Sequence, residues 1–221
     1  MSFPLVDPPA APCAASPSVL EAVGLECIRS DRVLFTDLHL AVRSGQLLQV
    51  EGPNGAGKTS LLRILCGLAA PTQGEVRWQG QAIRRVWQQF MTDTAYIGHH
   101  HGIKGDLTPA ENLRIARALG RPQPDVTIDD ALYQVGLEDF SDVPARILSA
   151  GQKRRVALSR LLATQARLWI LDEPLAALDV KGIGLVEEML SEHLRRGGMA
   201  VVTTHQPLAL GHGQLTRLSL A

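Results

Sequence analysis

The chain has 221 residues, of which 45% are hydrophobic and 20% charged, which is enough for one well-packed domain and too little for two. Lysine and arginine together number 22, as do aspartate and glutamate, so the net charge is zero and gives no sign of nucleic-acid binding. No apolar run approaches the roughly 20 residues of a membrane helix, so work at a membrane would require a partner. The three scattered cysteines, without a CxxC pair, are typical of a reducing compartment.

Residues 1–18 differ in composition from the rest of the chain. They hold five of the 13 prolines and lack a charged segment followed by an apolar core. This composition predicts a disordered tail and not a secretory signal, and the folded domain is expected over residues 19–221. Between residues 19 and 50, short alternating apolar runs separated by turn-forming residues predict antiparallel strands that lead into one buried strand.

The remaining elements alternate between helix and strand. A helix is predicted from residue 58 to about 70, and the next predicted strands are 75–83 and 94–98. Helical spacing dominates from about 106 to 165, in three predicted helices. After it come a strand, a helix and two strands, predicted at 167–172, 182–196, 199–205 and 214–220. The pattern indicates an α/β fold with a mostly parallel core sheet, an N-terminal antiparallel β subdomain and a helical insertion.

The sharpest motif is a full match to GxxxxGK[ST], which follows the apolar run LLQV and precedes a helix. Its glycines let backbone N–H groups converge on phosphates at the N-terminus of that helix. Lys58 is expected to reach the β and γ phosphate oxygens, and the Thr59 hydroxyl is expected to bind Mg²⁺. The predicted ATP-binding residues are Gly52, Pro53, Asn54, Gly55, Ala56, Gly57, Lys58, Thr59 and Ser60.

This P-loop alone leaves kinases, GTPases and many ATPases open, and the run LWILDE narrows the choice. Its four apolar residues predict a buried strand that ends in an acidic pair. Asp172 is expected to hold Mg²⁺ through water, and Glu173 is expected to polarise the attacking water. An acidic pair at a strand end can also be the start of an ordinary solvated loop.

A third motif leads directly into the basic helix KRRVALSRL and consists of Leu148, Ser149, Ala150, Gly151 and Gln152. With it the chain resembles the ABC ATPase family, whose signature is LSxGQ, over about residues 19–221. The resemblance implies a P-loop NTPase fold of the ABC type. It also implies that the signature of one subunit covers the ATP held by the P-loop of a second, so that the working unit is a homodimer. The same residues would also serve as an ordinary N-cap.

Two further positions fit the family. Asp179 resembles the residue of the D-loop that crosses the dimer seam, and His205 matches the switch histidine that contacts the γ-phosphate. The resemblance therefore implies a catalytic set of Lys58, Glu173 and His205.

Two positions depart from the family pattern. Family members usually have an aromatic residue that stacks on adenine. In this chain the corresponding place falls near Arg29, whose planar guanidinium could stack on adenine but less reliably. The glutamine of the loop that senses Mg²⁺ and the membrane partner is missing from the segment 98–102, where His100 is the predicted substitute. The three adjacent histidines also allow a metal site, but neighbouring residues on an extended chain point to opposite sides.

Longer stretches resemble the ATP-binding subunit of the cytochrome c maturation system, the haem exporter, above all YIGHHHGIKGDLTPAENL and TTHQPL. This resemblance implies ATP and Mg²⁺ as cofactors, and transmembrane permease subunits and haem-handling membrane proteins as partners, with no nucleic acid. It also implies a peripheral location on the cytoplasmic face of the bacterial inner membrane. The alternatives are another ABC exporter, or a soluble ABC-type ATPase that acts on nucleic acid or ribosomes. The charge run 153–155 is predicted to be a solvated helix face.

Overall fold

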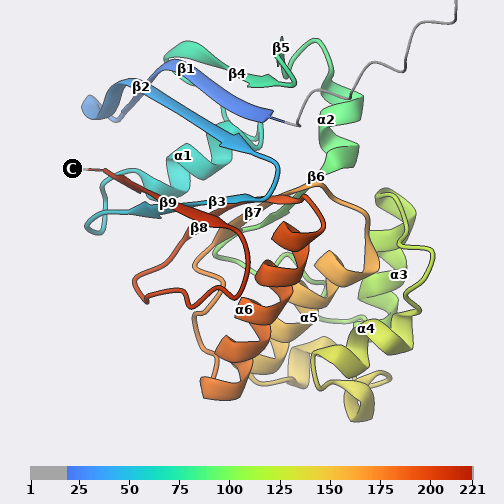
Figure 1. Cartoon of the computed structure of the whole chain (residues 1–221). Helices are drawn as coiled ribbons and strands as arrows, with labels where there is room; N and C mark the ends of the chain where they lie inside the picture. Colours follow the sequence, from blue (N-terminus) through green and yellow to red (C-terminus); the bar gives the residue numbers. More distant parts are fainter. Residues whose placement is uncertain (1–18, 221) are drawn as a thin grey trace, which may run out of the picture.

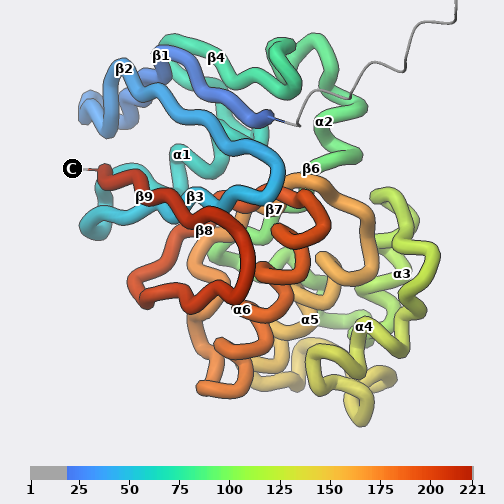
Figure 2. Tube along the Cα trace, in the orientation of Figure 1, coloured from blue at the N-terminus to red at the C-terminus, as the bar shows by residue number. Residues whose placement is uncertain are grey.

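The computed structural model describes residues 19–220, so the tail predicted for residues 1–18 lies outside the described part of the chain. Two β-sheets, six helices and two 3-10 turns of the described residues are arranged in layers (Figures 1 and 2). The strands are β1 (Val19–Arg29), β2 (Arg32–Arg43), β3 (Gln46–Glu51), β4 (Gln73–Trp78), β5 (Gln81–Ala82), β6 (Thr94–Ile97), β7 (Leu168–Asp172), β8 (Met199–Thr203) and β9 (Gln214–Ser219). The helices are α1 (Lys58–Leu65), α2 (Trp87–Asp93), α3 (Pro109–Leu119), α4 (Ile128–Gln134), α5 (Ala150–Ala163) and α6 (Val180–Arg195), with 3-10 turns at Glu138–Phe140 and Ala145–Ile147.

The first sheet is antiparallel, in the order β2-β1-β4-β5, and confirms the predicted N-terminal β subdomain. Strand β1 pairs with β2 on one side and with β4 on the other, which places Leu20 opposite Trp78. Between β4 and β5, Gln79 and Gly80 have φ angles of 52° and 77°. Two successive positive φ angles are what a type I′ hairpin turn requires, so the turn between these two strands is set by local sequence.

The second sheet carries the functional edge of the molecule. Its order is β6-β7-β8-β3-β9, and all of its strand pairs are parallel. Every residue of β7 and β8 is buried, as expected for strands whose two faces are both covered. The carboxyl ends of parallel strands meet at one edge of a sheet, so the segments that follow β3, β7 and β8 lie close together there.

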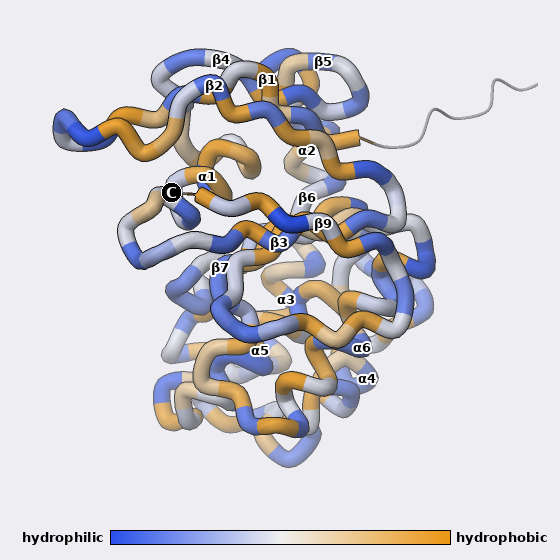
Figure 3. Tube along the Cα trace, turned by 60° about the vertical axis from the view of Figure 1, so that its left-hand side comes forward, coloured by the Kyte–Doolittle hydropathy of each residue, from blue (hydrophilic) through white to orange (hydrophobic). Residues whose placement is uncertain are grey.

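Helix α1 fills the space between the two sheets, and Figure 3 shows it coloured mainly as hydrophobic. Leu61, Leu62, Ile64 and Leu65 are all at most 1% exposed and join the inner face of the antiparallel sheet to β3, β7 and β8. Helices α5 and α6 pack against the opposite face of the parallel sheet (Figure 1). The protein is thus layered as sheet, helix, sheet and helices.

Helices α3, α4 and α5 share a third apolar cluster that includes the fully buried Leu113, Leu132 and Val156. Each of these helices begins at a capping box, with Thr108, Thr127 and Ser149 as the N-cap residues. In a capping box the N-cap hydroxyl and the side chain three residues later satisfy two backbone N–H groups that a helix start leaves unpaired. Local sequence therefore sets where these helices begin.

Helix α2 was not predicted from the sequence. Its N-cap residue, Val86, makes no side-chain cap hydrogen bond, and the helix is only seven residues long. It forms because Phe90 is fully buried against Trp78, at 5.8 Å between ring centroids, while Trp87 and Met91 stay 42% exposed. Tertiary packing produces this helix without any local start signal. No helix within residues 19–220 is long and apolar enough to cross a bilayer.

Helix α6 is fixed to the core sheet by a stacked ring pair. The rings of His193 and Trp169 lie 3.8 Å apart at 9°, and Nε2 of His193 donates to the carbonyl of Met199 at 3.1 Å. Burial disfavours the charged imidazolium and lowers the pKa of His193 to about 4, although the hydrogen bonds to backbone carbonyls oppose this shift.

The low pKa of His193 predicts that the folded protein loses stability in mild acid. Its folded pKa of about 4 lies below the ordinary value of 6.5, so the unfolded chain binds a proton first as the pH falls. The free energy of unfolding is then unaffected above pH 6.5 and declines by about 3 kcal/mol towards pH 4. His193→Phe, which keeps a ring on Trp169 but does not titrate, should show a flatter pH profile in urea unfolding. The exposed His212→Phe is the control, and equal profiles for both variants would contradict the assignment.

Candidate functional site

The glycine-rich loop after β3 needs its glycines for geometric reasons. Gly52, Gly55 and Gly57 have φ angles of 146°, 84° and 96°, values that side chains rarely allow. A Cβ on Gly52 would also lie 2.5 Å from the carbonyl oxygen of Leu220, which follows β9. The loop therefore turns back on itself tightly and delivers its backbone N–H groups to the N-terminus of α1, where anions bind well.

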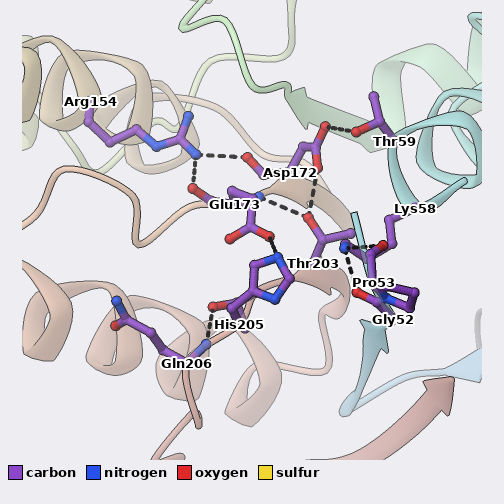
Figure 4. A network of polar contacts seen from close by, with 11 residues as sticks. Gly52, Pro53, Lys58, Thr59, Arg154, Asp172, Glu173, Thr203, His205 and Gln206 are labelled. Carbon is purple, nitrogen blue, oxygen red and sulfur yellow. Dashed lines mark hydrogen bonds and ion pairs between the residues drawn. The ribbon is translucent and has the colours of Figure 1, made fainter. Parts of the chain in front are cut away.

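Lys58 stands at the first position of α1 and folds over this loop. Its Nζ donates to the carbonyls of Gly52 at 2.7 Å and Pro53 at 3.1 Å (Figure 4). The ammonium group thus sits at the mouth of the loop, where phosphate oxygens would exchange with the two carbonyls as its partners.

Asp172 connects three elements at the carboxyl edge of the parallel sheet. Asp172 is only 2% exposed, and both oxygens of its carboxylate accept hydrogen bonds. The hydroxyl of Thr59 on α1 donates at 2.8 Å, and the hydroxyl of Thr203 at the end of β8 donates at 2.7 Å. A threonine hydroxyl and a carboxylate are oxygen ligands of the kind that Mg²⁺ prefers, so this pair fits the metal predicted from the sequence.

Glu173 follows in an unusual backbone conformation. Its φ is 51°, in the left-handed region, which costs about 1–3 kcal/mol for a residue with a side chain. Its N–H donates to both the carbonyl (3.1 Å) and the hydroxyl (2.9 Å) of Thr203. Its carboxylate oxygen lies 3.5 Å from Nε2 of His205 (Figure 4). The backbone strain aims the carboxylate away from the strand and into the space in front of the P-loop.

These groups surround one cavity of about 470 Å³, a size common for ligand sites. Its lining residues are Leu34, Asn54, Gly55, Gly57, Lys58, Thr59, Ser60, His99, Asp172, Glu173 and His205. A larger hollow of about 970 Å³ lies at the opposite end of β7, beside Trp169 and His193. We assign the chemistry to the smaller cavity, because it alone gathers the P-loop, a metal-binding oxygen pair and a carboxylate placed beside an imidazole.

Nine of the predicted site residues line this cavity, namely Asn54, Gly55, Gly57, Lys58, Thr59, Ser60, Asp172, Glu173 and His205. His99 lines the cavity, whereas His100 does not. The guanidinium of Arg29 donates to the carbonyls of Ile28 and Ala70, both at 3.1 Å, and is also absent from the lining.

The signature and Asp179 lie outside the cavity of their own chain. Ser149 caps α5, where its hydroxyl accepts from the N–H of Gln152 at 3.2 Å. Asp179 caps α6 and pairs with Arg155 at 2.8 Å. The N–H of Gly182, and then the Arg155 guanidinium, hold the pKa of Asp179 below its usual value. The capping role expected for the signature is therefore present in the single chain.

The structure corrects one prediction and adds two residues to the site. Within the charge run predicted as a solvated face, Arg154 is 1% exposed and points at the backbone around Glu173 (Figure 4). Burial lowers the pKa of its guanidinium, and the carboxylates of Asp172 and Glu173 oppose that shift. Thr203 was not singled out from the sequence, although the run TTH at the end of a buried strand marks its position.

Comparison with known proteins identifies the class to which this fold and cavity belong. The family described as "ABC transporter" matches residues 35–176. A putative ATP-binding ABC transporter protein from Pyrococcus furiosus has the same fold, with a TM-score of 0.76 at 24% identity over 90% of this chain and 97% of that one. A second solved structure, of an ATP binding subunit of an ABC transporter, gives a TM-score of 0.74 at 25% identity over 85% and 79% of the two chains.

Curated relatives narrow the class to one family. The cytochrome c biogenesis ATP-binding export protein CcmA of Methylococcus capsulatus is 58% identical over 87% of this chain and 94% of its own length. The protein of the same name from Nitrosospira multiformis is 50% identical over 91% and 98% of the two chains. The chain belongs to the CcmA family of ABC transporter ATP-binding proteins. The predicted family and fold class are thereby confirmed, and ABC membership implies ATP binding and hydrolysis coupled to transport.

The hydroxyl of Thr203 yields a test of the site geometry. Thr203→Val keeps the side-chain shape but removes a donor to Asp172 and an acceptor for the N–H of Glu173, so ATP turnover should fall about tenfold or more. The unpaired buried carboxylate oxygen should also cost about 1–3 kcal/mol in urea unfolding. The matched control is Thr204→Val, whose hydroxyl accepts only from the N–H of Gln206. Equal turnover in the two variants would refute the geometric role of Thr203.

Proposed function

We propose that this chain hydrolyses ATP at the interface between two copies of itself and drives a membrane complex of cytochrome c biogenesis. The observation that carries the proposal is the single cavity that unites the P-loop, the Thr59–Asp172 oxygen pair and the Glu173–His205 pair. The names of the relatives described above support the assignment to cytochrome c biogenesis and export.

The triphosphate is bound by the loop from Gly52 to Ser60. Backbone N–H groups and the N-terminus of α1 receive the β and γ phosphates, and Lys58 leaves its two carbonyl partners to neutralise them. Thr59 and Asp172 would hold Mg²⁺, which, when bound, neutralises charge that develops on the phosphate oxygens.

Glu173 is the proposed general base. Its carboxylate faces the P-loop across the cavity, and its Oε1, the atom 3.5 Å from Nε2 of His205, accepts no hydrogen bond from the described residues. An unpartnered acceptor at this place is available to receive a proton from the attacking water. His205, 3.5 Å away, is proposed to orient this carboxylate and to contact the γ-phosphate.

The loop 98–102 is proposed to sense the state of the site. His99 is the histidine that lines the cavity in the single chain, and His100, the residue suggested by the resemblance to the family, lies next to it. A neutral imidazole has one acceptor nitrogen and can take the part of a glutamine side-chain oxygen. The guanidinium of Arg29 is bound to backbone carbonyls, so Arg29 is given no role in holding adenine.

A second copy is proposed to complete the site. Ser149 is exposed and lies outside the cavity of its own chain. Two large apolar residues next to the signature and the D-loop, Ile147 and Val180, are 68% and 85% exposed, and the second copy would cover them. The signature of one copy and its Asp179 would then face the ATP of the other, across a symmetric interface.

The other proposed partners follow from the family. They are transmembrane permease subunits and haem-handling membrane proteins, and the chain would act as a peripheral subunit on the cytoplasmic face of the bacterial inner membrane. The relatives named as ATP-binding export proteins support this arrangement. The domain over residues 19–221, with its helical part at about 106–165, would be the ATPase unit of that complex.

The base is tested by Glu173→Gln. The amide keeps the shape but cannot accept the proton, so ATP should still bind while hydrolysis falls by about 100-fold or more. Nucleotide affinity is measured with a fluorescent ATP analogue and hydrolysis by phosphate release in the presence of the membrane complex. Glu138→Gln, at an exposed position on the helical side, is the matched control. Unchanged hydrolysis by Glu173→Gln would exclude Glu173 as the base.

The interface is tested by Ser149→Arg. A bulky cation on the signature should block closure on the second ATP, so hydrolysis should be lost while the single chain binds ATP with nearly the same affinity. Light scattering in ATP reports dimerisation, and Ser219→Arg on the exposed face of β9 serves as the control. Loss of ATP affinity in the monomeric variant would mean that the signature acts within one chain, against the proposed dimer.

A further inference from the structure

Arg154 is a buried arginine for which the ATP-binding scheme above has no use. It lies near the start of α5, five residues after Ser149 of the signature, and only 1% of the residue is exposed. None of the ion pairs formed within residues 19–220 includes it. A charged group in such a place is costly unless hydrogen bonds satisfy it, so its partners define its role.

Those partners are all backbone carbonyls of two loops beside the cavity. Nε donates to Pro174 at 3.2 Å, and one terminal nitrogen donates to both Asp172, at 2.8 Å, and Glu173. The other terminal nitrogen donates to Gly98 at 3.1 Å, where β6 ends and the sensing loop begins. One side chain therefore connects α5 to three successive residues of the catalytic segment and to the sensing loop.

The contact with Glu173 matters because this residue is strained. A left-handed φ of 51° in a residue with a side chain persists only where the surroundings impose it. Thr203 holds the N–H of Glu173, and Arg154 holds its carbonyl oxygen. The peptide groups on both sides of the Glu173 side chain are thus fixed by two separate elements, β8 and α5, as Figure 4 shows.

The chemistry of the guanidinium suits this task. It offers five N–H donors in a rigid plane, so it can bind carbonyls on two loops at once, whereas a lysine ammonium is a compact group on a flexible stem. Because the carbonyls belong to the backbone, a shift of α5 transmits its force to the main chain of Glu173 without depending on neighbouring side chains.

We propose that Arg154 is a positioning residue that couples the signature end of α5 to the catalytic Glu173 and to the sensing loop. This inference rests on the proposed function, in which the signature meets ATP held by a second copy. Engagement of Ser149 by that nucleotide moves α5, and Arg154 carries the movement to Glu173 of its own chain. Each subunit thereby aligns its base only when its signature is occupied.

The test compares the buried Arg154 with the partly buried Arg160 of the same helix. Arg154→Lys and Arg154→Met remove the fork that holds Glu173, whereas Arg160→Lys and Arg160→Met remove one nitrogen that binds the other end of the sensing loop, at His101 and Gly102, in bonds of 3.4 Å, and does not contact Glu173. In the full chain, Arg154 variants should keep ATP affinity within about twofold and lose about 10- to 100-fold in single-turnover hydrolysis, because a misplaced catalytic group costs that much. Arg160 variants should stay within about threefold of the wild type.

A double-mutant cycle distinguishes the positioning of Glu173 by Arg154 from a purely structural role of Arg154. In a Glu173→Gln background the base to be positioned is gone, so Arg154→Lys should lower the residual hydrolysis by no more than about twofold. If the Arg154 and Glu173 effects multiply, or if the Arg160 variants lose as much hydrolysis as the Arg154 variants, the positioning role is wrong. Failure of the proposed function gives a different result, because Glu173→Gln alone would then leave hydrolysis unchanged.

Amide hydrogen exchange provides a measurement that does not need activity. If Arg154→Met fails to fold, Arg154→Lys serves alone. The backbone amides of Glu173 and of residues 175–178 should exchange about tenfold faster in Arg154→Lys than in the wild type, and those of the Arg160→Lys control should not change. Equal exchange in wild type and Arg154→Lys would overturn the inference.

Discussion

Two hydroxyl groups donate to the buried carboxylate of Asp172, and the arrangement of the whole site depends on these hydrogen bonds. Thr59 brings the start of α1 to the end of β7, and Thr203 brings the end of β8. A carboxylate that is 2% exposed would strongly destabilise the fold without such donors. These two hydrogen bonds therefore fix the positions of α1, β7 and β8 relative to one another. The same Thr203 hydroxyl accepts from Glu173, and the positions of the P-loop, the metal-binding oxygens and the base are therefore linked.

Features that depend on local sequence could be predicted well. The P-loop requires glycines at fixed places between a strand and a helix, and the structure has positive φ angles at Gly52, Gly55 and Gly57. The start of α3 was readable because Thr108 and Glu111 form a capping box. Asp172 and Glu173 follow an apolar run that forms the fully buried strand β7. In each case the residues that carry the signal are neighbours in the chain, so their spacing alone determines the geometry.

Features that depend on tertiary contact could not be predicted. Arg154 lies in a run of three cations and carries no local sign of burial, because its partners are 56 residues before it and 18 to 20 residues after it. Helix α2 lacks a start signal and forms because Phe90 packs on Trp78. The choice between His99 and His100 depends on which way a short loop turns, and nothing in three identical side chains determines that direction.

The position of β3 within the parallel sheet has a consequence for how the protein is made. This strand carries the P-loop, yet its two neighbours, β8 and β9, follow it far along the chain, and Leu47 pairs with Ala200 and Leu215. Until those segments leave the ribosome, the backbone N–H and C=O groups along both edges of β3 have no partner in the sheet. Pairing across so long a stretch of chain is slow, because loop closure precedes any gain from contact. The nascent chain therefore emerges with an unsupported P-loop strand, and the nucleotide site closes only after β8 and β9 have been synthesised.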